Sequence, residues 1–143
     1  MNKKSLFRAT VPVCKKLIDL SISIYNSPED KNVKLPVPKH LILGKCLAEI
    51  GKMIPSLDSI VSAAIKTALE KEKDREDWFD AGDTVQSCIE SIYHIAIFAD
   101  LNSPGAVVVC LSGNKLYGGH GIDIEVKNGS ISRSDMGGNL DLY

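Results

Sequence analysis

The stretch NSPGAVVVCL, from Asn102 to Leu111, decides the predicted fold because the character of the chain changes there. Before it, apolar residues mostly recur at helical spacing, and after it short apolar runs alternate with turn residues. Ala106 to Leu111 is a continuous apolar run bounded by turn residues, as expected for a central strand that is covered on both faces. The boundary therefore predicts a helical part followed by a sheet.

The residues after this run predict an antiparallel hairpin. Apolar and charged side chains alternate from 122 to 127, which indicates a half-buried strand. Asn128-Gly129 favours a two-residue type I′ turn, in which both central residues need positive φ. Such a turn predicts two cross-strand pairs, Val126 with Ile131 and Ile124 with Arg133. The last strand is then weakly apolar, and we expect it at an edge of the sheet.

Two well-patterned helices are predicted in the middle of the chain. The first spans His40 to Ile54, where Pro55 blocks simple continuation. The second begins at Leu57 with Ser56 as its cap, and its apolar residues follow the helical template without a break.

Two other segments fit a helix or a strand. From Leu6 to Tyr25 a helical stripe favours a helix, although residues 17–25 also alternate as a strand would. A capping box of Asp83 and Gln86 indicates a helix that ends near Asp100, although residues 91–99 are rich in good strand formers. Taking helix in both places gives about four helices.

The sum predicts one α+β domain over residues 1–143, a length that suits a single core. A helical part, about 5–100, packs on an antiparallel meander of three to four strands, about 105–138.

Composition excludes several classes of function. With 17 basic and 18 acidic residues the formal net charge is −1, so no global field recruits nucleic acid or an anionic membrane. The N-terminal segment is too interrupted for a secretory signal, and no apolar stretch approaches the roughly 20 residues that span a bilayer. The four cysteines lack zinc-site spacing and sit among apolar residues. We expect a cytoplasmic protein with reduced cysteines and no metal or cofactor.

Charge is nevertheless segregated along the chain. Residues 1–50 carry nine basic and four acidic side chains, residues 51–100 carry five and ten, and the rest carry three and four. The acidic middle contains aromatic residues at 78 and 79, and this combination suits docking to a basic protein. The alternative is a solvated helix end and loop. The candidate contact residues are Asp74, Glu76, Asp77, Trp78, Asp80, Asp83 and Glu90.

A second candidate is His120, which three glycines flank in the segment YGGHGID, residues 117–123. A histidine on so free a backbone could act as a base or contact a ligand, with Asp123 beside it, and Asp123 with Glu125 could hold a metal. The alternatives are a glycine bulge at the start of a strand and an ordinary alternation of solvent-facing charges. No nucleotide-binding or hydrolase motif accompanies these residues.

The C-terminal segment resembles the tail of small bacterial immunity proteins from polymorphic-toxin and contact-dependent growth inhibition systems. The likeness rests on the strand at 106–111, the Gly-His-Gly-Ile segment at 119–122, the Asn128-Gly129 turn and the closing Gly137-Gly138, roughly the last 35 residues. It implies a cytoplasmic, non-enzymatic protein that binds a cognate toxin domain, often a nuclease, and blocks its active site or substrate path.

Two other functions stay open from the sequence. A small enzyme or ligand-binding domain would use the turn at His120. A homo-oligomer, such as a homodimer, would supply cover for the two-sided apolar strand at 106–111.

Overall fold

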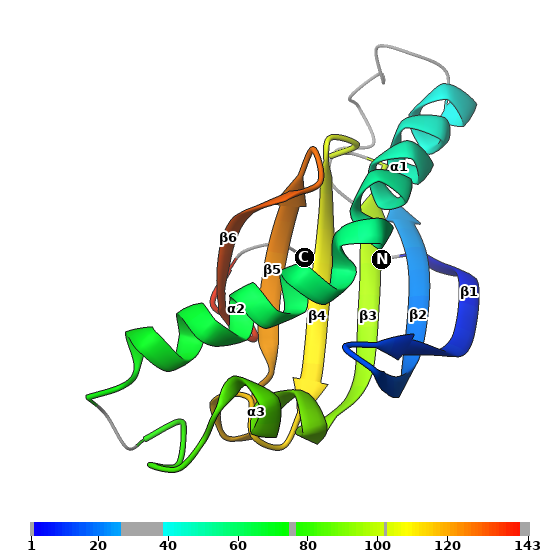
Figure 1. Cartoon of the computed structure of the whole chain (residues 1–143). Helices are drawn as coiled ribbons and strands as arrows, with labels where there is room; N and C mark the ends of the chain where they lie inside the picture. The colour runs from blue at the N-terminus through cyan, green and yellow to red at the C-terminus, as the bar shows by residue number, and fades with distance from the viewer. Residues whose placement is uncertain (1, 27–38, 75–76, 102, 141–143) are drawn as a thin grey trace.

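The computed structural model describes residues 2–26, 39–74, 77–101 and 103–140, and its main element is a six-stranded sheet (Figure 1). The strands follow one another across the sheet in chain order. β2 and β3 are parallel, and every other neighbouring pair is antiparallel. The strands are β1 (Asn2–Val13), β2 (Lys16–Asn26), β3 (Ile92–Asp100), β4 (Ala106–Gly113), β5 (Ile122–Lys127) and β6 (Ser130–Met136). The prediction of four helices on a meander of three to four strands is therefore wrong.

The first correction concerns residues 6–25, where we predicted a helix and β1 and β2 form a hairpin instead. The strand alternation is the pattern that the fold uses, because Ile18, Leu20 and Ile24 all point into the core. The turn consists of Cys14 and Lys15, with φ of 50° and 65°. Such turns usually carry glycine or asparagine, so nothing in the sequence marks this one.

The two helices of the middle segment are confirmed. α1 (Lys39–Met53) and α2 (Leu57–Lys71) are joined by a single 3₁₀ turn, η1 (Ile54–Ser56), which accommodates Pro55 near its start. Ser56 precedes α2 as predicted, but its side chain makes no capping hydrogen bond.

The second correction concerns the segment that leads to Asp100. The helix here, α3 (Val85–Ser91), has seven residues, and the chain then enters β3. Its capping box is formed by Thr84 and Ser87, not by Asp83 and Gln86: the Ser87 amide donates to Thr84 Oγ1 at 3.0 Å, and the Thr84 amide donates to Ser87 Oγ at 2.8 Å. Pairing with β2 and β4 on both sides makes the segment from Ile92, rich in good strand formers, a strand.

The C-terminal hairpin is confirmed in its turn and partly in its register. Asn128 and Gly129 both have positive φ, and Val126 lies opposite Ile131. Ile124 pairs with Ser134 rather than with Arg133, because the register shifts between Glu125 and Val126. This β-bulge adds one residue to β6, which is the edge strand that the sequence predicted.

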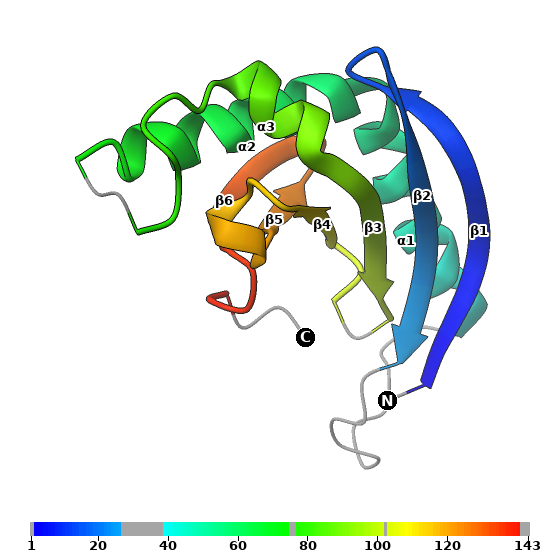
Figure 2. The same ribbon diagram turned by 90° about the horizontal axis from the view of Figure 1, so that it is seen from below.

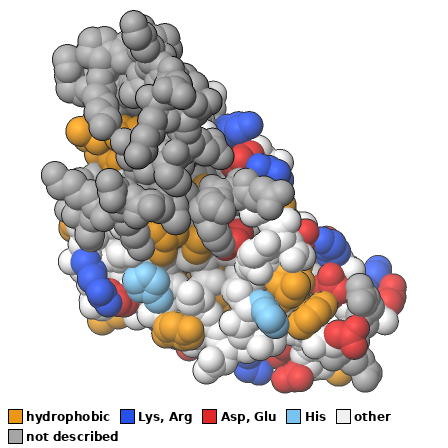
Figure 3. All heavy atoms as spheres, turned by 180° about the vertical axis from the view of Figure 1, so that it is seen from behind, with side chains coloured by type: hydrophobic (Ala, Val, Ile, Leu, Met, Phe, Trp, Pro, Cys, Tyr) orange, Lys and Arg blue, Asp and Glu red, His pale blue; other side chains and the backbone are white. Residues whose placement is uncertain are grey.

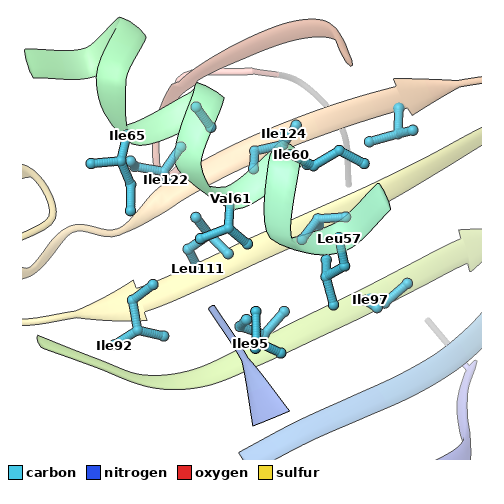
Figure 4. Close-up of a cluster of buried hydrophobic side chains, with 14 of the residues drawn as sticks. Leu57, Ile60, Val61, Ile65, Ile92, Ile95, Ile97, Leu111, Ile122 and Ile124 are labelled. Atoms are coloured by element: carbon cyan, nitrogen blue, oxygen red, sulfur yellow. The ribbon is translucent and has the colours of Figure 1, made fainter. Parts of the chain in front are cut away.

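The helices lie on one face of the sheet, and the core is between the two layers (Figures 1 and 2). Figure 4 shows α2 directing one apolar stripe at β3, β4 and β5. These side chains are almost fully buried, which makes this interface the main hydrophobic contribution to stability. The labelled cluster comprises Leu57, Ile60, Val61, Ile65, Ile92, Ile95, Ile97, Leu111, Ile122 and Ile124.

The opposite side of the sheet, which we call the open face, carries polar side chains. Asp123 and Glu125 point to it from β5, yet they are only 3% and 8% exposed, so the expectation of solvent-facing charges is wrong. Asp123 accepts a hydrogen bond from the Gly138 amide at 2.9 Å. Glu125 accepts hydrogen bonds from Arg133 at 3.1 Å and Ser132 at 2.7 Å, and these bonds hold its pKa below the usual value.

All four cysteines are free thiols. Cys46 and Cys88 are fully buried in the core, and burial raises the pKa of the Cys88 thiol to about 11. In the described part of the chain, no helix combines the length and hydropathy that crossing a bilayer requires.

Candidate functional site

Two segments that the sequence presented as separate candidates meet at one end of the molecule. The indole ring of Trp78 contacts the imidazole ring of His120 edge to face, with 5.3 Å between ring centroids and 87° between ring planes. Trp78 is half-buried and His120 is exposed, so the pair has a solvent-facing side. We call Trp78, His120 and the exposed Asp77 and Asp80 the Trp78 surface.

The loop after α2 holds Trp78 in place through its neighbours. Phe79 is buried, with its ring centroid 5.0 Å from that of Tyr117. Asp80 and Asp83 close a tight turn, because the Asp83 amide donates to the Asp80 carbonyl and the Asp80 amide donates to Asp83 Oδ2. The loop is therefore fixed on the C-terminal side of Trp78.

The glycine-rich turn carries His120 next to Trp78. Tyr117, Gly118, Gly119 and Gly121 all have positive φ, and the amides of Gly119 and Gly121 both donate to the Leu116 carbonyl at 3.0 Å. The indole ring lies near Gly118, because an added Cβ at that position would be in van der Waals contact with Trp78 Cε3, at 3.8 Å. The glycines thus serve the backbone bend, because they adopt positive φ without steric strain.

The predicted acidic residues divide between surface and structural positions. Asp74, Asp77 and Asp80 are exposed, whereas Glu76 lies outside the described residues. Asp83 is structural: its side chain is 4% exposed and pairs with Lys115 Nζ at 3.0 Å. This hydrogen bond raises the pKa of Lys115 and ties the loop to the turn before η2 (Tyr117–Gly119).

Two other predicted residues take structural roles. Glu90, on α3, accepts a hydrogen bond from Gln86 at 2.9 Å, and its main-chain carbonyl accepts from Lys16 of β2. Asp123, the expected partner of His120, bonds the Gly138 amide in the turn after β6. Among the described residues, no three His, Cys, Asp or Glu side chains gather as a metal site requires.

A polar cluster on the open face was missed by the sequence reasoning. The Ser21 hydroxyl lies 3.1 Å from His94 Nε2, and His94 Nδ1 lies 3.3 Å from Asp19 Oδ2. Arg8 Nη2 donates to the same Asp19 oxygen at 3.0 Å and holds the pKa of that carboxyl below its usual value. The signal that could have found this cluster is the polar side of the strand alternation in residues 18–24.

Comparisons of this chain with protein-family models, with curated proteins and with solved structures find no match.

Proposed function

We propose that this chain is an immunity-type protein, which binds one cognate toxin domain through the Trp78 surface and so blocks the toxin's active site or substrate path. The observation that carries the proposal is the contact between Trp78 and His120 beside exposed carboxylates. The resemblance of the C-terminal segment to immunity proteins gives the class of partner.

The aromatic pair has the properties of an interface anchor. Binding energy at protein interfaces concentrates in a few aromatic or arginine side chains that sit in well-packed surroundings. The half-buried ring of Trp78 packs against His120 and lies near Gly118, and the next residue, Phe79, is buried. A ring that already packs against its neighbours loses less conformational entropy when a partner covers it than a freely rotating ring does.

The charge around the anchor favours a basic partner. Residues 72–83 include six acidic and two basic side chains, and both acidic members of the Trp78 surface are exposed. Carboxylates at the rim of an interface steer a positively charged partner and raise its association rate. A toxin domain that binds nucleic acid carries such a positive surface. We therefore favour a nuclease as the toxin.

The test is to co-express the chain with the product of the neighbouring reading frame and to measure both growth and binding. We expect the chain to restore growth, and we expect Trp78→Ala to weaken binding by about 30-fold or more, since interface anchors contribute about 2 kcal/mol or more. Tyr93→Ala is the matched control, because Tyr93 is also a large exposed aromatic, at 61%, but lies on β3 outside the Trp78 surface.

Two results would contradict the proposal. One is that a strain without this gene grows normally and that the product of the neighbouring reading frame does not bind the chain. The other is binding that W78A and Y93A weaken equally, with both variants folded by circular dichroism, because a contact face elsewhere would then be required.

A further inference from the structure

The polar cluster on the open face reproduces the contacts of a serine nucleophile with its base. In a Ser-His-Asp set, the hydroxyl meets one imidazole nitrogen and the carboxylate meets the other. Here Ser21 Oγ contacts Nε2 of His94 at 3.1 Å, and Asp19 contacts Nδ1 at 3.3 Å. The tautomer with its proton on Nδ1 lets the ring donate to Asp19 and accept from Ser21.

Strand pairing explains why these side chains meet. Asp19 and Ser21 are two residues apart on β2 and so share a face. The parallel register sets His94 of β3 opposite Asp19. The three groups thus stand on two hydrogen-bonded strands, and the imidazole ring contacts both residues of β2.

Arg8 completes the set from the other side of β2. The antiparallel register of β1 and β2 sets Arg8 directly opposite Ser21. Its ion pair with Asp19 uses Nη2, and the guanidinium group has five N–H donors in all. Its side chain is 71% exposed, so donors of Arg8 can reach an oxyanion that forms next to Ser21.

We propose that Ser21, His94, Asp19 and Arg8 form a hydrolytic site for carboxylic esters, separate from the Trp78 surface. Figure 3 shows two distinct histidine patches on this side of the molecule, in keeping with two sites. This activity goes beyond the binding function proposed above and does not depend on it.

The reaction follows from the geometry. Ser21 Oγ attacks the ester carbonyl carbon while its proton passes to His94 Nε2, and the carbonyl oxygen becomes an oxyanion near Arg8. The tetrahedral intermediate expels the alcohol, which takes the proton from His94, and leaves an acyl group on Ser21. Water then attacks that acyl carbon, gives one proton to His94, and the acid departs as Ser21 recovers the proton. Asp19 orients the ring throughout.

The surroundings of Ser21 favour a short acyl group. Its partner on β3 is Ala96, whose methyl side chain is nearly buried at 8% exposure and leaves a small apolar floor beside the hydroxyl. The partly exposed ring of His94, at 26%, keeps the site open to a substrate from solvent. Acetyl and other short unbranched esters therefore fit best.

The experiment measures hydrolysis of p-nitrophenyl acetate and labelling by diisopropyl fluorophosphate. In the labelling reaction Ser21 Oγ forms a bond to phosphorus, fluoride leaves, and the serine proton passes to His94. We expect Ser21→Ala and His94→Ala to reduce the enzymatic rate by about 100-fold or more, and Asp19→Asn by more than about tenfold. Mass spectrometry should find the phosphoryl adduct on Ser21.

Ser112→Ala is the matched control, because Ser112 of β4 lies opposite His94 on the side away from Asp19. It should leave the rate and the labelling unchanged. A rate that falls in H94A but not in S21A would assign the turnover to imidazole alone and overturn the proposal. Wild-type protein with no adduct at Ser21 and no rate above the folded S21A variant would also overturn it.

Discussion

Single glycines set the geometry of the Trp78 surface. Gly121 has φ of 79°, and a Cβ placed there would overlap the Leu111 carbonyl oxygen. Gly137 is equally tight, since its Cβ would overlap the carbonyl oxygen of His120. Both positions pack tightly against backbone next to His120. A side chain at either one would therefore displace the backbone that carries the histidine.

Gly121→Ala should lower the free energy of unfolding by about 1–3 kcal/mol, because alanine meets both an unfavourable φ and a backbone clash. Urea unfolding at pH 7 measures the change. Gly82→Ala is the control, because Gly82 has open space around its Cβ and no positive φ. Equal stability of G121A and G82A would show that the backbone at 121 relaxes freely.

Glu125 makes stability depend on pH. Its hydrogen bonds to Arg133 and Ser132 lower its pKa in the folded state, so the folded protein holds the charged form to lower pH than the unfolded chain does. The stabilisation is complete above the ordinary glutamate pKa of about 4.3 and is lost as pH falls through the lower folded pKa.

Glu125→Gln should therefore destabilise the protein by about 1.5–3 kcal/mol at pH 7, the range for hydrogen bonds to charged groups. The difference between the variant and wild type should shrink at pH 3, as urea unfolding at the two pH values would show. Glu70→Gln, at an exposed position on α2, should change stability by less than about 0.5 kcal/mol. A deficit of E125Q that is the same at both pH values would contradict this account.

At the scale of elements, the hairpin of β1 and β2 depends on a contact far away in the chain. The Cys14 amide donates to Asp58 Oδ1 at 2.9 Å, and the Cys14 thiol lies 3.5 Å from the Asp58 carbonyl. Asp58, in the first turn of α2, thereby stabilises the strained β-turn of Cys14 and Lys15. A local reading of the sequence cannot detect a turn that is stabilised in this way.

Lys15→Gly should stabilise the protein by up to about 1 kcal/mol, because glycine adopts φ of 65° without steric strain. The same change at Lys66, exposed within α2, should destabilise by about 1 kcal/mol, since glycine is a poor helix former. Thermal and urea unfolding of both variants would show the opposite signs. A destabilised K15G would mean that the turn carries no strain.

The sequence predicted correctly the elements that local patterns determine, and it failed where contacts between distant segments decide the structure. α1, α2 and the Asn128-Gly129 turn were predicted because their patterns are local. Residues 17–25 and 91–99 fit both periods, and pairing with neighbouring strands, including the parallel pairing of β2 with β3, selects strand for each. The cluster of Ser21 and His94 depends on that pairing, so the same ambiguity concealed it.

At the scale of the whole molecule, local signals identified the parts of the Trp78 surface but not their contact. The acidic run and its tryptophan were visible in composition, and His120 was visible through its glycines. Their contact depends on the sheet, because the connection between β4 and β5 carries the glycine turn to the loop after α2.

The double change Asp77→Asn with Asp80→Asn should slow association with a basic partner by about tenfold at low salt and reduce the salt dependence of the rate. Stopped-flow association at several salt concentrations measures both effects. Ala63→Lys with Thr67→Lys is the control, because it changes net charge equally on exposed positions of α2. Identical slowing in both double variants would indicate an effect of net charge alone.

The most direct test of the Trp78 surface uses the fact that Trp78 is the chain's one tryptophan. Labelling with 5-fluorotryptophan gives a single ¹⁹F resonance that reports on the proposed contact itself. Titration with the unlabelled product of the neighbouring reading frame should shift or broaden this resonance until the two proteins are equimolar. Saturating binding, established by calorimetry, that leaves the resonance unchanged would contradict the account.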